Sequence, residues 1–213
     1  MDLDDTKLTH EGLKLPAPQK ARVLLLACGA LAHEILALIR ANGWDHLSLT
    51  CLPAILHNTP EKITPAVEQA VLRHRDDFDQ IFVVYADCGT GGLLQAACER
   101  LGVEMMPGPH CYAFFEGVDS FAEHGEGTAF YLTDFLVKQF DSFVWKPLGL
   151  DRYPELLPSY FRYYDRLVYL AQTDDPDLDS RARDCAARLG LEYERRLTGY
   201  GDLGSALTDH SSR

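Results

Sequence analysis

The chain alternates short apolar runs with amphipathic helical stretches, and this order constrains its fold more than any other feature. Apolar runs of strand length occupy residues 22–27, 46–53, 80–87, 103–108, 166–172 and 191–199. Helical spacing occupies the stretches between them at residues 30–43, 59–78, 91–102, 128–144, 152–165 and 177–190, and residues 110–127 predict a loop with short helical turns. Strands that alternate with helices predict a mostly parallel sheet covered on both faces, a Rossmann-like three-layer α/β/α fold.

The length of the chain fits a single domain. Its 213 residues, 46% of them hydrophobic, are enough for one sizeable core. Residues 1–20, which contain two prolines, predict an irregular leader, and residues 201–213 a C-terminal tail. Between them, residues 21–200 are expected to form one α/β domain, because no linker is long enough to divide them.

Charge and hydropathy exclude several classes of protein. A net charge of −12 disfavours binding to nucleic acid, whose phosphates are held by clusters of Lys and Arg. No membrane span is expected, since the longest apolar stretch is interrupted by Gly29, His33 and Glu34. The first 20 residues lack the basic and apolar regions of a signal peptide, so a cytoplasmic location is the expectation.

The six cysteines divide into two groups. Cys98 and Cys185 lie within amphipathic helical patterns, where a small apolar side chain packs in the core, and packing also accounts for Cys51. Cys28, Cys88 and Cys111, in contrast, lie where apolar runs give way to loops. Because the carboxyl ends of parallel strands meet at one edge of a sheet, we expect these three thiols to lie close together. Three thiolates suit zinc or an iron–sulfur cluster, although the compact CxxC spacing is absent.

Other polar residues near the same edge could assist such a site. His57 precedes a proline-marked helix and is a candidate fourth ligand or acid/base. His110 is a second candidate, although it is adjacent to Cys111 and two adjacent residues seldom both reach one metal ion. Asp87 and Glu34 are candidate catalytic or substrate-facing groups.

The loop "CGTGG" at residues 88–92 offers a further candidate contact. Gly89 and Thr90 could contact a cofactor, because glycines after a strand let backbone N–H groups approach an anion. The lysine of a phosphate-binding loop and the GxGxxG spacing are both missing, and a tight strand–helix turn explains Gly91 and Gly92.

Several separated motifs resemble, in order, the family known as domain of unknown function 1638: "ACGALAHEI", "LPAILHNTPEKI", "YADCGTGG", "GPHCYAFFEG", "FYLTDFLVKQFD" and "GLDRYPEL". The cysteines of that family pattern correspond to Cys28, Cys88 and Cys111, with His57 in the "LHN" motif. Members occur near genes for corrinoid-dependent methyltransferases, so the resemblance implies a corrinoid or methyltransferase protein as a partner.

The leading hypothesis is a cytosolic metalloprotein with a [4Fe–4S] cluster or Zn²⁺ held by the three cysteines. It would be a metal-dependent lyase or transferase acting on a small molecule, or an accessory, in corrinoid-linked methyl-group metabolism. A first alternative is a metal-free enzyme in which Cys88 attacks and His57 or His110 is the base. A second is a non-catalytic binding partner of a corrinoid protein, in which the thiols only pack.

Overall fold

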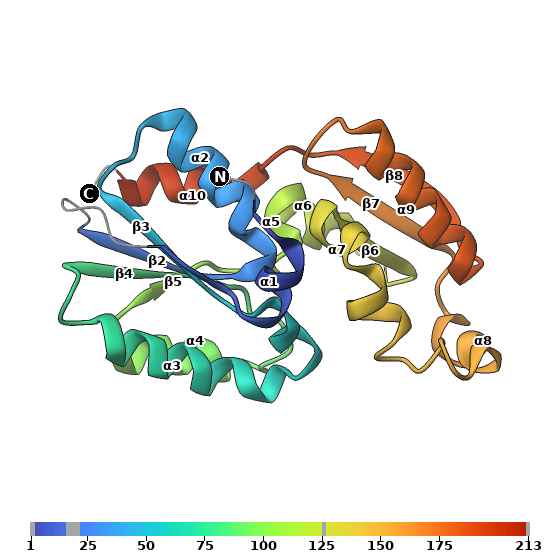
Figure 1. Ribbon diagram of the computed structural model, residues 1–213, viewed down its shortest axis with the longest axis horizontal. Coiled ribbons are helices and arrows are strands. Elements are labelled where there is room, and N and C mark those ends of the chain that lie inside the picture. The colour runs from blue at the N-terminus through green and yellow to red at the C-terminus, as the bar shows by residue number, and fades with distance from the viewer. Residues whose placement is uncertain (1–2, 16–21, 125–126, 212–213) are drawn as a thin grey trace.

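The computed structural model describes residues 3–15, 22–124 and 127–211, which form two β-sheets with helices around them (Figure 1). The five-stranded sheet has the order β1-β3-β2-β4-β5. β2, β3, β4 and β5 run parallel and β1 is antiparallel. The bounds are Leu13–Lys14 (β1), Val23–Cys28 (β2), Leu47–Leu52 (β3), Gln80–Val84 (β4) and Glu104–Met105 (β5).

The second sheet has three parallel strands in the order β6-β7-β8, with β6 at Ala129–Thr133, β7 at Arg166–Ala171 and β8 at Glu192–Leu197. The mixed α/β class with mostly parallel strands is therefore confirmed. The sequence prediction of a single sheet did not anticipate that the strands are shared between two.

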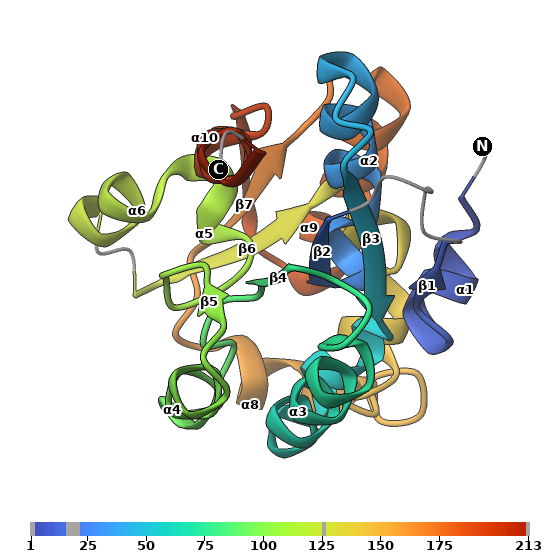
Figure 2. The same cartoon turned by 90° about the vertical axis from the view of Figure 1, so that its left-hand side faces the viewer.

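Helices cover both faces of the five-stranded sheet, with α2 and α10 over one face and α3 and α4 over the other (Figure 2). α9 packs on β7 and β8 of the second sheet. The helices are α1 Asp5–His10, α2 Ala32–Asn42, α3 Ile63–His74, α4 Leu93–Leu101, α5 Ala113–Glu116, α6 Val118–His124, α7 Asp134–Lys138, α8 Leu157–Phe161, α9 Pro176–Leu189 and α10 Gly201–Ser211. None of the helices in the described part of the chain is long and apolar enough to cross a membrane.

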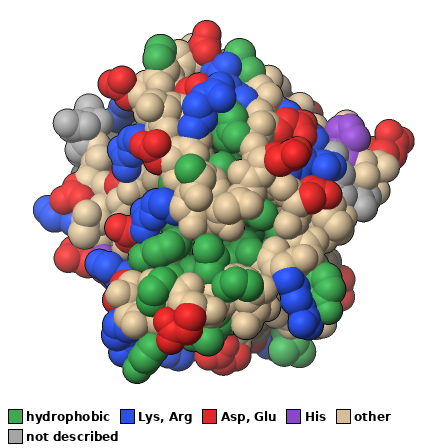
Figure 3. All heavy atoms as spheres, turned by 90° about the vertical axis from the view of Figure 1, so that its right-hand side faces the viewer, with side chains coloured by type: hydrophobic (Ala, Val, Ile, Leu, Met, Phe, Trp, Pro, Cys, Tyr) green, Lys and Arg blue, Asp and Glu red, His purple; other side chains and the backbone are tan. Residues whose placement is uncertain are grey.

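The two sheets share a hydrophobic core. All six residues of β2 are buried, as expected for a central strand covered on both faces. One continuous cluster of buried apolar side chains includes Leu26 and Val83 from the first sheet together with Leu132 and Tyr169 from the second. On the outer face that carries α8 and the three-stranded sheet, hydrophobic side chains gather in the lower half of the view (Figure 3).

Two predictions for individual segments need correction or refinement. Residues 128–144, predicted to be a helix, form strand β6 and then α7, because Thr133 adopts an extended conformation and its hydroxyl accepts from the Leu136 N–H. Within the predicted irregular leader, Asp4 caps α1 and Leu8 is buried. Residues 16–20, which complete that leader, lie outside the described residues.

The N-terminal and C-terminal segments both join distant parts of the fold. Asp5 on α1 contacts His33 of α2 at 2.6 Å and Lys138 of α7 at 3.8 Å. The segment predicted to be a tail forms α10, whose His210 stacks on Phe82 of β4 with ring centroids 3.6 Å apart.

Candidate functional site

The carboxyl ends of β2 and β4 border a small cavity that the end of β6 closes from the second sheet. Its polar lining consists of Cys28, His57, Tyr85, Cys88, Cys111, Tyr112 and Thr133. The other lining side chains are aliphatic or phenyl groups. The cavity has a volume of about 40 Å³. Because a single water molecule needs roughly 10–15 Å³, the cavity has room for only a few atoms.

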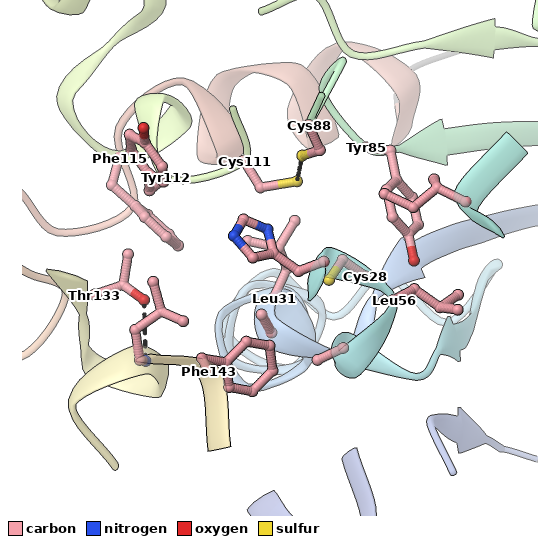
Figure 4. A pocket seen from close by; sticks show the side chains of 15 residues that line it. Cys28, Leu31, Leu56, Tyr85, Cys88, Cys111, Tyr112, Phe115, Thr133 and Phe143 are labelled. Atoms are coloured by element: carbon pink, nitrogen blue, oxygen red, sulfur yellow. Dashed lines mark hydrogen bonds between the residues drawn. The ribbon is translucent and has the colours of Figure 1, made fainter. Parts of the chain in front are cut away.

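Cys88 lies in a strained loop between β4 and α4. Its φ of +47° is the one positive value of a non-glycine residue in the described ranges, and three of the next four residues are glycines with positive φ. Backbone hydrogen bonds join this loop to the one after β5: the N–H of Asp87 donates to Gly108 O at 3.0 Å and that of Cys88 to Pro109 O at 2.9 Å. These bonds bring the Cys88 and Cys111 sulfur atoms to 3.2 Å, and Figure 4 shows them pointing at one another.

The two thiols of this pair differ in acidity. A hydrogen bond from the Cys111 side chain lowers the pKa of Cys88, whereas the same contact raises the pKa of Cys111. Cys88 is therefore the group that loses its proton first, with the Cys111 S–H as donor to the thiolate.

The remaining polar groups of the cavity are neutral at neutral pH. Burial raises the pKa of Cys28 to about 12, so it is held as a thiol. The Tyr85 hydroxyl is buried without a partner in hydrogen-bonding geometry within the described residues. His57 follows β3 on a short 3₁₀ segment, Ala54–Asn58. It is exposed on one side and borders the cavity, where desolvation by the surrounding protein lowers its pKa and favours neutral imidazole.

Asp87, Gly89 and Thr90 lie outside the lining of this cavity. The Asp87 carboxylate accepts hydrogen bonds from Thr90 Oγ1 at 2.8 Å, Gly92 N at 2.7 Å and Gly91 N at 3.1 Å. Burial acts to raise the pKa of Asp87, but these bonds outweigh it and hold the pKa below its usual value. Gly89 and Thr90 border a different groove, between α3 and α4.

Glu34 and His110 are also separate from the inner cavity. Glu34, in the first turn of α2, is 6% exposed, and within the described ranges its Oε2 has no hydrogen-bond partner. Burial raises its pKa to about 7. His110 borders an outer groove and stacks on Tyr112 with ring centroids 4.9 Å apart.

A comparison with protein families matches residues 51–207 to "Protein of unknown function (DUF1638)". The chain belongs to this family. The stretch matched to the family model contains His57, Cys88 and Cys111 and begins after Cys28 and Glu34. Neither a curated protein nor a solved structure matches the chain.

Two residues of this DUF1638 cavity escaped the sequence analysis. Tyr85 ends the apolar run of β4, where it looks like one more core residue. Thr133 was hidden inside a segment predicted to be helical; the signal that could have revealed it is the pair Thr133-Asp134 directly after a buried apolar run.

The cavity offers the donors that a soft metal prefers, although they are not arranged as a closed set. Over the described ranges, no three His, Cys, Asp or Glu side chains are grouped so as to hold a metal ion. Two thiolates on tetrahedral zinc, each about 2.3 Å from the metal, are about 3.8 Å apart. The Cys88–Cys111 pair, at 3.2 Å, is within a small side-chain rotation of that spacing. Cys28 and His57 line the same cavity and are further donors of suitable chemistry.

Proposed function

We propose that this chain holds a thiophilic metal centre through Cys28, Cys88 and Cys111. The centre is Zn²⁺, for which the cavity of about 40 Å³ has room, or a [4Fe–4S] cluster, for which the cavity would have to widen. The observation that carries the proposal is that three thiols from separate segments, the end of β2 and the loops after β4 and β5, line one cavity and that two of them are in contact. His57 is then a fourth ligand or an acid/base beside the centre. Thiolates are the preferred ligands of both kinds of centre, and an apolar lining limits access of water to them.

The protonation of the cavity gives this proposal a consequence. Cys28 is protonated at neutral pH, so a bound metal has to displace its proton. Neutral His57, by contrast, has a lone pair ready without loss of a proton. A bound metal with an open position supplies a Lewis acid. The assignments as a metal-dependent lyase or transferase, and to corrinoid-linked methyl-group metabolism, stay predictions.

A second function is favoured by the asymmetry of the thiol pair. The pKa of Cys88 is lowered while Cys111 is held as a donor, which is the arrangement of an activated nucleophile. Cys88 would then attack an electrophilic substrate without any metal, and His57 is the base that borders the same cavity.

Metal analysis of protein purified without oxygen separates the two functions. We expect zinc, or iron with sulfide and a visible absorbance band, in proportion to the protein, and loss of either in Cys88→Ala. The matched control is Cys185→Ala, which removes a buried thiol from α9 that is not part of the cavity lining. Metal-free, colourless protein even after anaerobic reconstitution would refute the metal centre. Selective alkylation of Cys88 in such protein would support the nucleophile.

A further inference from the structure

We propose that the groove outside the thiol cavity binds a flat, uncharged ring compound, which is the substrate presented to the thiol centre. The binding site itself is independent of the metal, but its role as a substrate site rests on the function proposed above. The groove is bordered by β6, by the segment after α7 and by the loops that carry His57 and His110. Its volume of about 360 Å³ lies in the range of small-molecule sites.

The groove and the thiol cavity are contiguous. Four residues line both of them, namely His57, Tyr112, Leu136 and Phe143. A compound in the groove therefore lies next to the cavity that contains Cys28, Cys88 and Cys111. The inner cavity, at about 40 Å³, has room for only a few atoms, so the bulk of any substrate has to occupy the outer groove.

Parallel aromatic rings form one wall of the groove. His110 stacks on Tyr112 with centroids 4.9 Å apart and Tyr112 stacks on Tyr131 at 5.5 Å, each pair inclined by only 14°. On another part of the lining, Phe130 meets Tyr164 edge to face at 5.7 Å. Because Tyr131 and Tyr112 cover each other and Tyr131 is only 9% exposed, a ligand meets mainly the ring edges of this stack, together with Phe130 and Tyr164. A flat ring fits against such edges and makes edge-to-face contacts, whereas a puckered ring fits poorly.

The lining also selects against charge. Although 24% of the chain is charged, no Asp, Glu, Lys or Arg is among the residues described as lining this groove. A charged ligand would lose its hydration here without gaining a counter-ion.

Polar recognition is provided instead by uncharged groups. Tyr112 and Tyr164, each of which carries a hydroxyl, belong to the lining. β6 is the edge strand of its sheet, and four consecutive residues, 129–132, border the groove. About half of the N–H and C=O groups of an edge strand point away from its partner strand, toward the space beside it. These groups suit ring N–H, ring nitrogen or carbonyl substituents of a neutral ring.

Calorimetric titration with three matched probes tests the proposal. 2-Naphthol is flat and neutral at pH 7, decahydro-2-naphthol is neutral but puckered, and naphthalene-2-sulfonate is flat but anionic. We expect saturable 1:1 binding of 2-naphthol and at least tenfold weaker binding of the other two. Tyr164→Leu should weaken 2-naphthol binding about tenfold, because it removes a ring that lines the groove and is 36% exposed.

Two variants keep the test interpretable. Tyr163→Leu removes a tyrosine that is 69% exposed and is not part of the groove lining, and it should leave binding unchanged. Cys88→Ala should also retain 2-naphthol binding, whatever its metal content. Equal affinity for the three probes, or affinity that Tyr164→Leu leaves unchanged in folded protein, would overturn the groove assignment. Intact binding in a protein that never takes up metal would refute the metal centre and leave the groove as a ligand site.

Discussion

Where the two sheets meet, the strands of the five-stranded sheet lead to thiols with few partners, whereas those of the three-stranded sheet lead to polar groups that satisfy one another. Asp134, directly after β6, accepts from Tyr169 Oη at 2.7 Å, Gln172 N at 3.0 Å, and Thr173 N and Oγ1 at 3.1 and 2.6 Å. Gln172 completes the network by accepting from the Asp134 N–H at 2.8 Å. Thiols hydrogen-bond weakly, so the opposite edge keeps ligands and nucleophiles available.

Two buried carboxyl groups show the same contrast. Asp134 is 4% exposed and has four donors around it, while Glu34 is 6% exposed and its Oε2 has no partner in the described residues. A saturated network fixes the geometry at the end of β6, and the polar groups of the network itself are not free to bind a ligand. The chemistry of this protein is therefore expected to come from the thiol side, with the second sheet as its rigid support.

The largest expected effect is at the saturated edge. Asp134→Ala leaves two backbone N–H groups and two hydroxyls without their acceptor, and we expect it to lower the free energy of unfolding by about 3–5 kcal/mol. Cys111→Ala, at the other edge, should cost only about 1 kcal/mol in metal-free protein, because it removes one small side chain. Urea unfolding at pH 7 measures both.

Asp76→Ala is the control for this comparison, since Asp76 is exposed and its loss should change stability by less than about 0.5 kcal/mol. Equal losses for Asp134→Ala and Cys111→Ala would contradict the view that only one edge is a saturated network.

Glu34 gives a pH-dependent effect of intermediate size. Burial raises its pKa from 4.5 to about 7, so on raising the pH the unfolded chain loses this proton first. The stability of the folded state relative to the Glu34→Gln variant is therefore greatest below pH 4.5 and falls between about pH 4.5 and 7. A shift of this size corresponds to about 3 kcal/mol.

Unfolding of wild type and Glu34→Gln at pH 5, 6, 7 and 8 checks this expectation, because other titrating groups cancel in the difference. Glu123→Gln, at an exposed glutamate, serves as the control. A flat difference for Glu34→Gln would mean that this carboxyl has a partner in solution.

The sequence alone predicts much of this arrangement, and the failures have a common cause. Strand–helix alternation located β2, α2, β4 and α4, because their hydrophobic patterns are local. The packing of helix α10 and the division into two sheets depend on contacts between elements that are distant in the sequence. Hydrophobic periodicity does not predict such contacts. β6 was missed because its four apolar residues and Thr133, followed by a short helix, also match a helical period.

The candidate site shows the same limit. The rule that parallel strands end at one edge predicted that the loops carrying Cys28 and Cys88 would be neighbours. The contact between Cys88 and Cys111 depends on backbone hydrogen bonds to Gly108 and Pro109, which no pattern of side chains encodes. The sequence predicts Asp87 near the site, but its carboxylate accepts hydrogen bonds from three donors within its own loop.

The smallest expected effect concerns the backbone at the thiol edge. Cys88 has a φ of +47°, while Thr133, at the end of β6, is extended with a φ of −110°. A side chain at positive φ costs roughly 1–2 kcal/mol, and glycine avoids this cost but loses about 0.4–1 kcal/mol through the entropy of the unfolded chain. Cys88→Gly should therefore be more stable than Cys88→Ala, by up to about 1 kcal/mol.

Within α9 the order should invert, with Cys185→Gly about 1 kcal/mol less stable than Cys185→Ala. The urea midpoints of the four metal-free variants measure the two Gly-minus-Ala differences in stability. If glycine is less stable than alanine at both positions, the loop of Cys88 relaxes in solution. The contrast between the two edges then does not extend to their backbones.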